Sequence, residues 1–420
     1  MKGIVFRELR PFRVQALLRE YQEGEGLLGR LVQIKNRNKL IIGRVVDFRR
    51  FPAPSEKNDQ VSFREETVLD IELLTALSGG TRVPFDSPIE LSSEVGFLED
   101  FPFERNTHTG YLGHFWGTNI KAPLILQDFQ TLKEAYHFFV AGQTGSGKST
   151  LVQMLLALYN KLNPRMNFLI LDTVGEFTAS FKGKRELFMH LKDVWKGDVE
   201  IYTPPMNLTL KTIKDVIGSF LNSALEGSLG KCVVLDFTLY KAGGDPVALR
   251  TEYVRETLRQ LYNAGLELYR RSGNLNLNTL VVLEEAHNYV PKRTDDDETT
   301  VLSNEIVKYF IETKDFGVGW MCITTCPSNV RREVFDHSRV KFIGMGFTSG
   351  PDAELLKEAF GPEFFNIYRL FPDPSDPLSP KKEVCFVISG PITLLSRQSP
   401  EFITVFSSKE EFIKANWEDS

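Results

Sequence analysis

The residues from Gly142 to Thr150 could bind the phosphates of a nucleotide. They read Gly142, Gln143, Thr144, Gly145, Ser146, Gly147, Lys148, Ser149 and Thr150, which fits G-x-x-x-x-G-K-[ST] in full. In such a loop the backbone N–H groups and the positive end of the next helix face the phosphates, and glycines let the backbone approach. Lys148 can reach the β- and γ-phosphates, and the Ser149 hydroxyl can ligate Mg²⁺. The alternative is a chance glycine-rich turn, but apolar runs at 138–141 and 151–156 predict the required strand and helix. We therefore expect a nucleoside triphosphate site.

Two adjacent carboxylates, Glu284 and Glu285, end the apolar run 280–283. In a P-loop protein the first acid of such a pair usually holds the Mg²⁺ shell, and the second polarises the attacking water. We assign Glu284 to the metal together with Ser149, and Glu285 to the water as general base. A solvated turn is the alternative interpretation of two adjacent acids.

Two further strand ends carry polar groups. Asp172 ends the run 167–172, and Glu176 follows four residues later, so their carboxylates could face the nucleotide. Asp172 could instead cap the next element. Thr325 ends the run 319–325 and could contact the γ-phosphate or the attacking water, although an ordinary strand-end role is at least as plausible.

The elements that must position these residues alternate between apolar strands and amphipathic helices from about residue 120 onward, which is typical of an α/β sheet. Strands are expected at 137–141, 167–172, 232–237, 279–283, 319–325 and 340–346, with a long helix over 246–271 and two closing strands at 384–389 and 402–406. The fold class is therefore α/β, with a RecA-like P-loop NTPase core.

The first 110 residues favour a small β-barrel. Short, β-branched, partly alternating runs occur at 31–34, 40–48 and 67–73, and they are separated by breaks such as Pro52–Ser55 and Ser78–Thr81. The expected domains are a β-barrel at 1–110, a linker at 111–130, the ATPase domain at 131–380 with a helical insertion at about 205–275, and C-terminal strands and a tail at 381–420.

Composition limits the function classes. The chain has 420 residues and a net charge of −5, which neither indicates nor excludes nucleic-acid binding. Four cysteines lie in apolar runs without metal-ligand spacing, and we interpret them as reduced core residues. The first residues are charged, and no 18-residue apolar run occurs, so we expect a soluble cytoplasmic protein without a membrane segment.

Together these features resemble the HerA family of hexameric DNA-translocating ATPases, within the larger FtsK-like group. The resemblance runs nearly end to end and rests on the barrel-like front, His137, Asp172-x-x-Gly175-Glu176-Phe177, Glu285-Ala286-His287-Asn288 ending at Pro291, Cys326-Pro327-Ser328, the strand 339–343, Asp352-x-x-Leu355 and the closing β-pair. It implies ATP as the nucleotide, a homo-hexameric ring, double-stranded DNA as substrate, and a NurA-like nuclease or another effector on the barrel face.

The chain departs from the family at the residues that usually stabilise transition-state charge. Glu284 stands where the family usually has Asp, Thr325-Cys326 where it has Gln-Arg, Tyr136 where it has Arg, and Lys314 where a second Arg is expected. Lysine supplies charge but not the planar fork of arginine. Lys314, Arg339, Arg331 or Arg332 could take this role from a neighbouring subunit.

Residues that could contact DNA are less specific. Basic pairs occur at Lys292-Arg293 and Arg331-Arg332, and each is more often plain surface charge than a DNA contact. A third basic run occupies 182–185 and has no better support. Two other function classes also fit the sequence. One is a secretion or conjugation motor, which would usually bring membrane segments. The other is a regulatory or structural ring that binds ATP and scaffolds an effector enzyme with little turnover, and the missing arginines favour it.

Overall fold

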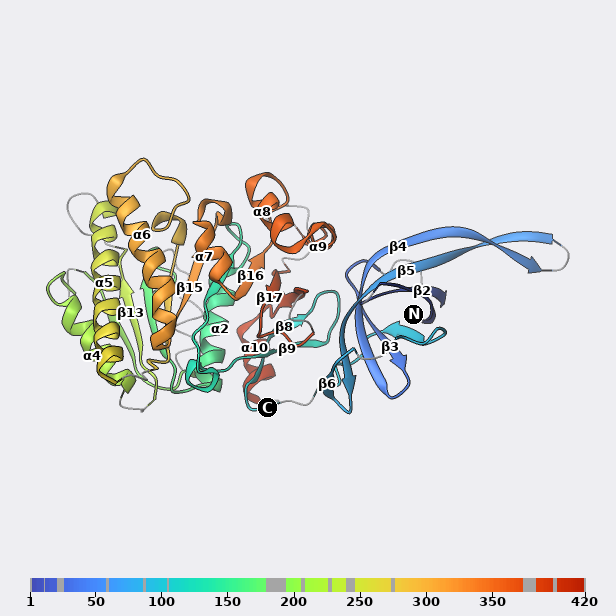
Figure 1. Cartoon of the computed structure of the whole chain (residues 1–420), viewed down its shortest axis with the longest axis horizontal. Helices are drawn as coiled ribbons and strands as arrows, with labels where there is room; N and C mark the ends of the chain where they lie inside the picture. Colours follow the sequence, from blue (N-terminus) through green and yellow to red (C-terminus); the bar gives the residue numbers. More distant parts are fainter. Residues whose placement is uncertain are drawn as a thin grey trace.

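The computed structural model describes residues 2–10, 12–20, 26–57, 60–85, 88–103, 106–178, 194–204, 208–225, 229–238, 246–272, 276–372, 383–395 and 399–418. Its strands form two sheets, one at the N-terminal end of the chain and a larger one covered by helices (Figure 1). The α/β class with a small N-terminal barrel is therefore confirmed.

The N-terminal sheet is a closed antiparallel barrel. Its strands are β1 (Lys2–Arg10), β2 (Arg13–Glu20), β3 (Leu31–Asn36), β4 (Lys39–Lys57), β5 (Gln60–Ser78), β6 (Thr81–Val83) and β7 (Glu94–Phe97). The order is β2-β1-β7-β3-β4-β5-β6, and pairing of β2 with β5 closes the ring. Alternate residues of these strands, such as Val32, Ile34 and Ile71, fill its interior.

Strands β4 and β5 are far longer than the sequence predicts. Each has 19 residues, and they stay paired from Leu40–Leu77 out to Lys57–Gln60, so they extend past the barrel as a two-stranded ribbon (Figure 1). The break predicted at Pro52–Ser55 is wrong, because Pro52 and Pro54 lie within β4. A proline lacks the N–H donor, and it is tolerated where a strand has a neighbour on one side only.

The large sheet carries the α/β domain. Its strands are β8 (Thr109–Phe115), β9 (Lys121–Ile125), β10 (Phe138–Ala141), β11 (Asn167–Asp172), β12 (Val199–Tyr202), β13 (Cys232–Asp236), β14 (Thr279–Leu283), β15 (Val318–Thr324), β16 (Val340–Gly344), β17 (Cys385–Ser389) and β18 (Glu401–Val405). The order is β12-β13-β11-β14-β15-β10-β16-β17-β18-β8-β9. Pairing is parallel from β12 to β16 and antiparallel from β16 onward.

Residues 111–130, expected as a linker, contribute to this sheet. They contain most of β8 and all of β9, which pair with each other and, through β8, with β18. Leu112, Phe115 and Leu124 are buried, so the segment is bound by its apolar side chains as well as by the ladder. The domain boundaries in this region remain a proposal.

Helices cover both faces of the sheet (Figure 1). They are α1 (Phe129–Leu132), α2 (Lys148–Leu162), α4 (Ile213–Leu225), α5 (Pro246–Ser272), α6 (Asp297–Glu312), α7 (Arg332–His337), α8 (Gly350–Phe360), α9 (Pro362–Tyr368) and α10 (Lys409–Ile413), with short turns η2 (Ala286–Asn288), η3 (Thr313–Phe316), η4 (Pro327–Asn329) and η5 (Lys414–Glu418). The expected insertion at about 205–275 contains α4, the sheet strand β13 and all of α5.

The core has two halves, one on each side of the sheet. Phe138 and Val140 of β10 pack with the α2 side chains, whereas Phe139 and Ala141 pack with the side of α5 and α6. This alternation is why the strands read as continuous apolar runs. Within the described ranges, no helix is both long and apolar enough to cross a membrane.

Candidate nucleotide site

The P-loop connects β10 to α2, as its sequence predicts. Gly147 precedes the first helical residue, Lys148, so the loop N–H groups and the N-terminus of a 15-residue helix face the same space. Two glycines have left-handed backbones that disfavour other residues, Gly145 at φ 85° and Gly147 at φ 83°. A Cβ on Gly147 would lie 2.6 Å from Cγ1 of Val384, so the loop packs tightly against the start of β17.

Hydrogen bonds fix the position of this loop. The Gln143 side chain donates to the carbonyl of Gly346 at 2.8 Å, and the Gly142 N–H donates to the carbonyl of Thr324 at 3.3 Å. Lys148 Nζ lies 3.3 Å from the carbonyl of Gln143, within the loop itself. The loop is therefore tied to the ends of β15 and β16, the two strands that flank β10.

Glu285 and Thr325 lie together beside the loop. They follow β14 and β15, which pair in parallel with Leu283 opposite Cys322, and Thr325 Oγ1 lies 3.4 Å from Glu285 Oε2. Glu285 has a left-handed backbone, with φ 47° and ψ 48°, which is uncommon for a residue with a side chain. Such strain recurs at functional sites, where the surrounding structure holds it.

Glu284 points into the protein instead. It is buried, and in the part of the chain that the structure describes its Oε2 has no hydrogen-bond partner. Burial, and then the nearby charge of Asp172, raise the pKa of Glu284 well above its usual range. The two adjacent acids therefore lie in separate environments, and their roles stay predictions.

Asp172 holds a turn, and its contact with a nucleotide stays a prediction. Its Oδ1 accepts from the N–H groups of Gly175 and Glu176 at 2.7 and 3.1 Å, and its Oδ2 accepts from Phe177 and from both the N–H and the hydroxyl of Thr178 at 3.0 Å. This is the capping alternative, because all five donors belong to the next element. The turn leaves Glu176 exposed.

Charge gathers around Lys148. Burial lowers its pKa, and the carboxylates of Glu285, Glu176 and Glu284 oppose that shift. With one lysine near three acids, the site would attract an added cation or an amino group more strongly than a bare anion. A triphosphate would therefore need a divalent ion in addition to Lys148.

The two candidate cations, Lys314 and Arg339, lie at the amino ends of the parallel strands, opposite the end that carries the P-loop. Lys314 belongs to η3, just before β15, and Arg339 precedes β16, whereas the P-loop follows the opposite end of β10. Their charges, after burial as the main cause, help to lower the pKa of His137, just before β10, to about 3. A four-residue strand spans about 13 Å, so neither cation reaches Glu285 of its own subunit.

Two of the remaining basic candidates are paired with acids. Arg331 binds Asn304 and Glu333, and Arg332 binds Asp336 and Glu358. Lys292 and Arg293 are exposed. The run 182–185 lies outside the described residues.

Sequence reasoning missed two residues at this site. His287 Nδ1 lies 3.2 Å from Glu285 Oε2 and 3.1 Å from Thr324 Oγ1. Cys326, expected in the core, is half-buried next to Thr325, with its Sγ 3.8 Å from the threonine hydroxyl, while the other three cysteines are buried. The spacing of Glu285-Ala286-His287 could have indicated the first, since a turn after a strand brings nearby side chains together.

The site fits a nucleotide with Mg²⁺. Ser146 Oγ is buried without a partner among the described residues, and Gly142 leaves space beside it that a Cβ would fill at 2.3 Å. The half-buried Ser149 hydroxyl is an ordinary ligand for Mg²⁺, and the Glu284 carboxyl would join it only in its ionised form. No group of three or more His, Cys, Asp or Glu within the described ranges could hold a metal alone, so phosphate oxygens would complete the shell.

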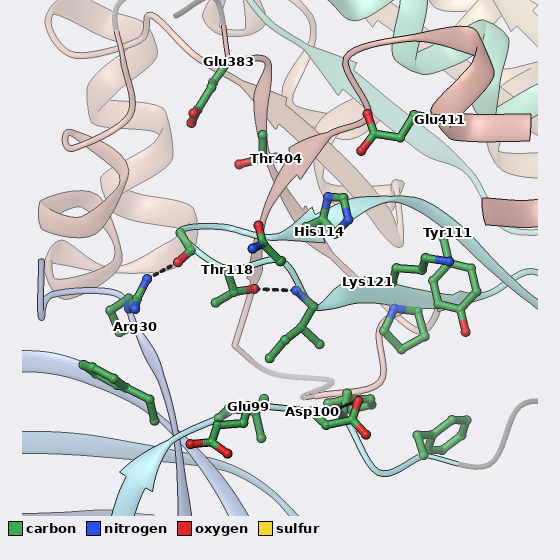
Figure 2. A pocket seen from close by; sticks show the side chains of 18 residues that line it. Arg30, Glu99, Asp100, Tyr111, His114, Thr118, Lys121, Glu383, Thr404 and Glu411 are labelled. Carbon is green, nitrogen blue, oxygen red and sulfur yellow. Dashed lines mark hydrogen bonds between the residues drawn. The ribbon is translucent and has the colours of Figure 1, made fainter. Parts of the chain in front are cut away.

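A separate cleft of about 1090 Å³ lies between the barrel and the closing strands. Figure 2 shows Arg30 of the barrel reaching the turn after β8, with Glu383, Glu411 and Lys121 around the same space. No P-loop residue lines it. Size alone therefore does not locate the nucleotide site in this protein.

Comparison with known proteins confirms the resemblance to HerA. Residues 112–227 match the family model described as helicase HerA, central domain. The match includes the P-loop, Asp172 and Glu176 and ends before Glu285. Over these residues the chain is therefore similar to the central domain of HerA.

Solved structures give distant likenesses. The genome packaging NTPase B204 of Sulfolobus turreted icosahedral virus 2 has a TM-score of 0.38 and 12% identity, over 65% of this chain and 97% of that one. VirB4 of Thermoanaerobacter pseudethanolicus has a TM-score of 0.41 and 10% identity, over 73% and 99%. No curated protein matches the sequence closely enough to count as a relative. No conclusion about activity rests on these structures.

Proposed function

We propose that this protein, which carries a HerA-type ATPase domain, hydrolyses ATP to translocate on double-stranded DNA as a homo-hexameric ring. The observation that carries the proposal is the convergence of Lys148, Glu285 and Thr325 at one sheet edge, because a P-loop that only binds nucleotide does not need a placed base.

The residues divide the work of hydrolysis. Lys148 and the loop N–H groups bind the β- and γ-phosphates, and Glu285 accepts a hydrogen bond from the water that attacks the γ-phosphorus in line. Thr325 lies where it can hold the same carboxylate or contact the γ-phosphate. Mg²⁺, held through Ser149 and Glu284, would neutralise phosphate charge.

A ring accounts for the missing cation. The active site of one subunit contains Lys148 but no arginine among the candidates, while Lys314 is exposed at the opposite edge and makes no ion pair with any described residue. Arg339 is bound to Glu134 at 2.7 Å. We therefore favour Lys314 of a neighbouring subunit as the residue that stabilises transition-state charge.

The barrel would seat the partner. Phe48 and Phe51 are exposed on β4, where it leaves the barrel, and aromatic side chains are common anchors in protein interfaces. A nuclease resembling NurA, or another effector enzyme, would bind this face, in DNA-end processing or in phage defence.

The first experiment measures steady-state ATP hydrolysis with and without linear double-stranded DNA, using Lys148→Ala as the blank. We expect DNA to stimulate turnover, and the stimulation to fall steeply with salt because the contacts are to phosphates. Turnover unchanged by DNA at low salt would contradict a DNA translocase.

A regulatory ring that binds ATP and scaffolds an effector is the alternative. It is favoured by one observation, the pairing of Arg331 and Arg332 with acids, which leaves only lysine as a free candidate finger. Such a ring would bind ATP but turn over at the blank rate with and without DNA, and its assembly with an effector would survive Glu285→Gln.

A further inference from the structure

His287 contacts the proposed general base directly. Its Nδ1 lies 3.2 Å from Glu285 Oε2, and both side chains are about one quarter exposed, at 23% and 24%. It is placed there by η2, the short turn that starts immediately after Glu285. A hydrogen bond stabilises this turn, because the Asn288 N–H donates to the Glu285 carbonyl at 2.8 Å.

The chemistry of the contact assigns the imidazole proton. An ionised carboxylate only accepts hydrogen bonds, so the nitrogen that faces it must carry the proton. Nδ1–H therefore faces Glu285 Oε2 at 3.2 Å, an ion-pair distance, while its hydrogen bond is with Thr324 Oγ1 at 3.1 Å. Thr325 Oγ1 approaches the same Oε2 at 3.4 Å. An N–H and a hydroxyl beside the same oxygen favour one orientation of the carboxylate, which would leave Oε1 for the attacking water.

The histidine also joins the base to the P-loop. Thr324 is the last residue of β15, and while its hydroxyl faces His287, its carbonyl accepts the N–H of Gly142 at 3.3 Å. Its hydroxyl accepts the Cys326 N–H as well, at 3.1 Å. A shift of the P-loop would therefore reach Glu285 through Thr324 and His287, which are hydrogen-bonded to each other.

We propose that His287 is a positioning residue that holds the Glu285 carboxylate in its water-activating orientation through Nδ1 and couples that orientation to the P-loop through Thr324. The inference rests on the proposed ATPase function. It predicts that His287 affects turnover and leaves nucleotide binding unchanged, because the imidazole lies against the base and not against the loop.

Three substitutions in the full chain test this role. His287→Ala removes the donor. His287→Asn keeps a donor nitrogen at the same number of bonds from the backbone as Nδ1, whereas His287→Gln places it where Nε2 was. We expect His287→Ala and His287→Gln to lower kcat at least about tenfold with KM for ATP unchanged within about twofold, and His287→Asn to retain most of the wild-type kcat.

The outcomes distinguish the positioning role of His287 from the proposed ATPase function. Equal loss in the Asn and Gln variants, or a weakened affinity for ATP in all three, overturns the positioning role. If His287→Ala does not fold, the Asn–Gln comparison decides alone. A wild-type protein that is no faster than Lys148→Ala overturns the proposed function and this inference with it, whereas active wild type and equally active His287→Ala overturn this inference only.

Discussion

The hydroxyl of Thr325 lies 3.4 Å from the carboxylate of Glu285. Glu285 follows the end of β14 and Thr325 follows the end of β15, and 39 residues lie between them in the sequence. Parallel strands bring their carboxyl ends to one edge of a sheet, and here that edge also carries the P-loop. The contact places a threonine beside the proposed base, where the related family usually has glutamine.

Glu285→Gln is expected to separate binding from turnover. Glutamine keeps the shape of the side chain but cannot accept the proton of the attacking water, so ATP turnover should fall at least about 100-fold while ATP affinity stays within about threefold. Turnover is measured by phosphate release, and affinity by displacement of a fluorescent nucleotide. Glu354→Gln, a change at an exposed position of α8, is the matched control. Turnover that survives in Glu285→Gln would assign the base elsewhere.

Gly147→Ala tests the close packing of the P-loop. The methyl group would lie 2.6 Å from Val384, and the backbone has a left-handed φ, so the loop must move and its affinity for ATP should fall. Gly350→Ala is the control, since its φ is 73° but no atom lies within 4 Å of the added Cβ. We expect the control to lose about 1 kcal/mol of stability from φ alone and to bind ATP normally. ATP-induced shifts in Tm measure both effects, and identical shifts would refute the packing argument.

Asp172→Asn tests the turn from Gly175 to Thr178. Either orientation of the amide turns an NH₂ group toward backbone N–H donors, so we expect the free energy of unfolding to fall by about 2 kcal/mol. Asp236→Asn disturbs only the two bonds to Thr238 and should cost less. Urea denaturation of both variants gives the comparison. A loss of ATP affinity at unchanged stability would restore the original expectation that Asp172 faces the nucleotide.

Glu401 should make stability depend on pH. Burial raises the pKa of this carboxyl to about 7, and its Oε2 has no partner among the described residues. The folded state holds the proton longer than the unfolded state, so the stabilisation is complete below about pH 4.5 and is lost as the pH rises toward 7, on the order of 3 kcal/mol in all.

Glu401→Gln should remove this part of the pH dependence and raise Tm at pH 8 relative to wild type. The exposed Glu383→Gln serves as the control and should leave the profile unchanged. Parallel wild-type and Glu401→Gln profiles between pH 5 and 8 would show that the buried carboxyl does not titrate as stated.

Mixing subunits tests the role of Lys314. Lys314→Ala has an intact site but lacks the proposed cation, whereas Glu285→Gln has the cation but a dead site. If the lysine acts on a neighbour, a mixed ring of the two inactive variants regains part of its turnover. The control is a mixture of Glu285→Gln with Lys148→Ala, in which every site is dead and no activity should return. An absence of recovery in mixed rings shown by mass to contain both chains would exclude Lys314 from this role.

The strand, loop and helix of the candidate nucleotide site could be predicted from sequence because their determinants are local. The loop from Gly142 to Thr150, its strand and its helix form one continuous segment, and their periodicity and glycine spacing act over a few residues. The same is true of the eight strands predicted in the α/β region, whose predicted and observed ends differ by no more than two residues, whereas β8, β9 and β12 were not predicted.

Contacts between distant segments were decided only by the tertiary structure. The use of Asp172 in a turn, the burial of Glu284 beside it and the contact of His287 with Glu285 depend on how side chains point after strands are placed side by side. Likewise, residues 111–130 looked like a linker, because the local sequence does not show that β8 pairs with β18, almost 300 residues later. Local propensity carries no information about such partners, since their free energy comes from burial and hydrogen bonds that exist only once the sheet is assembled.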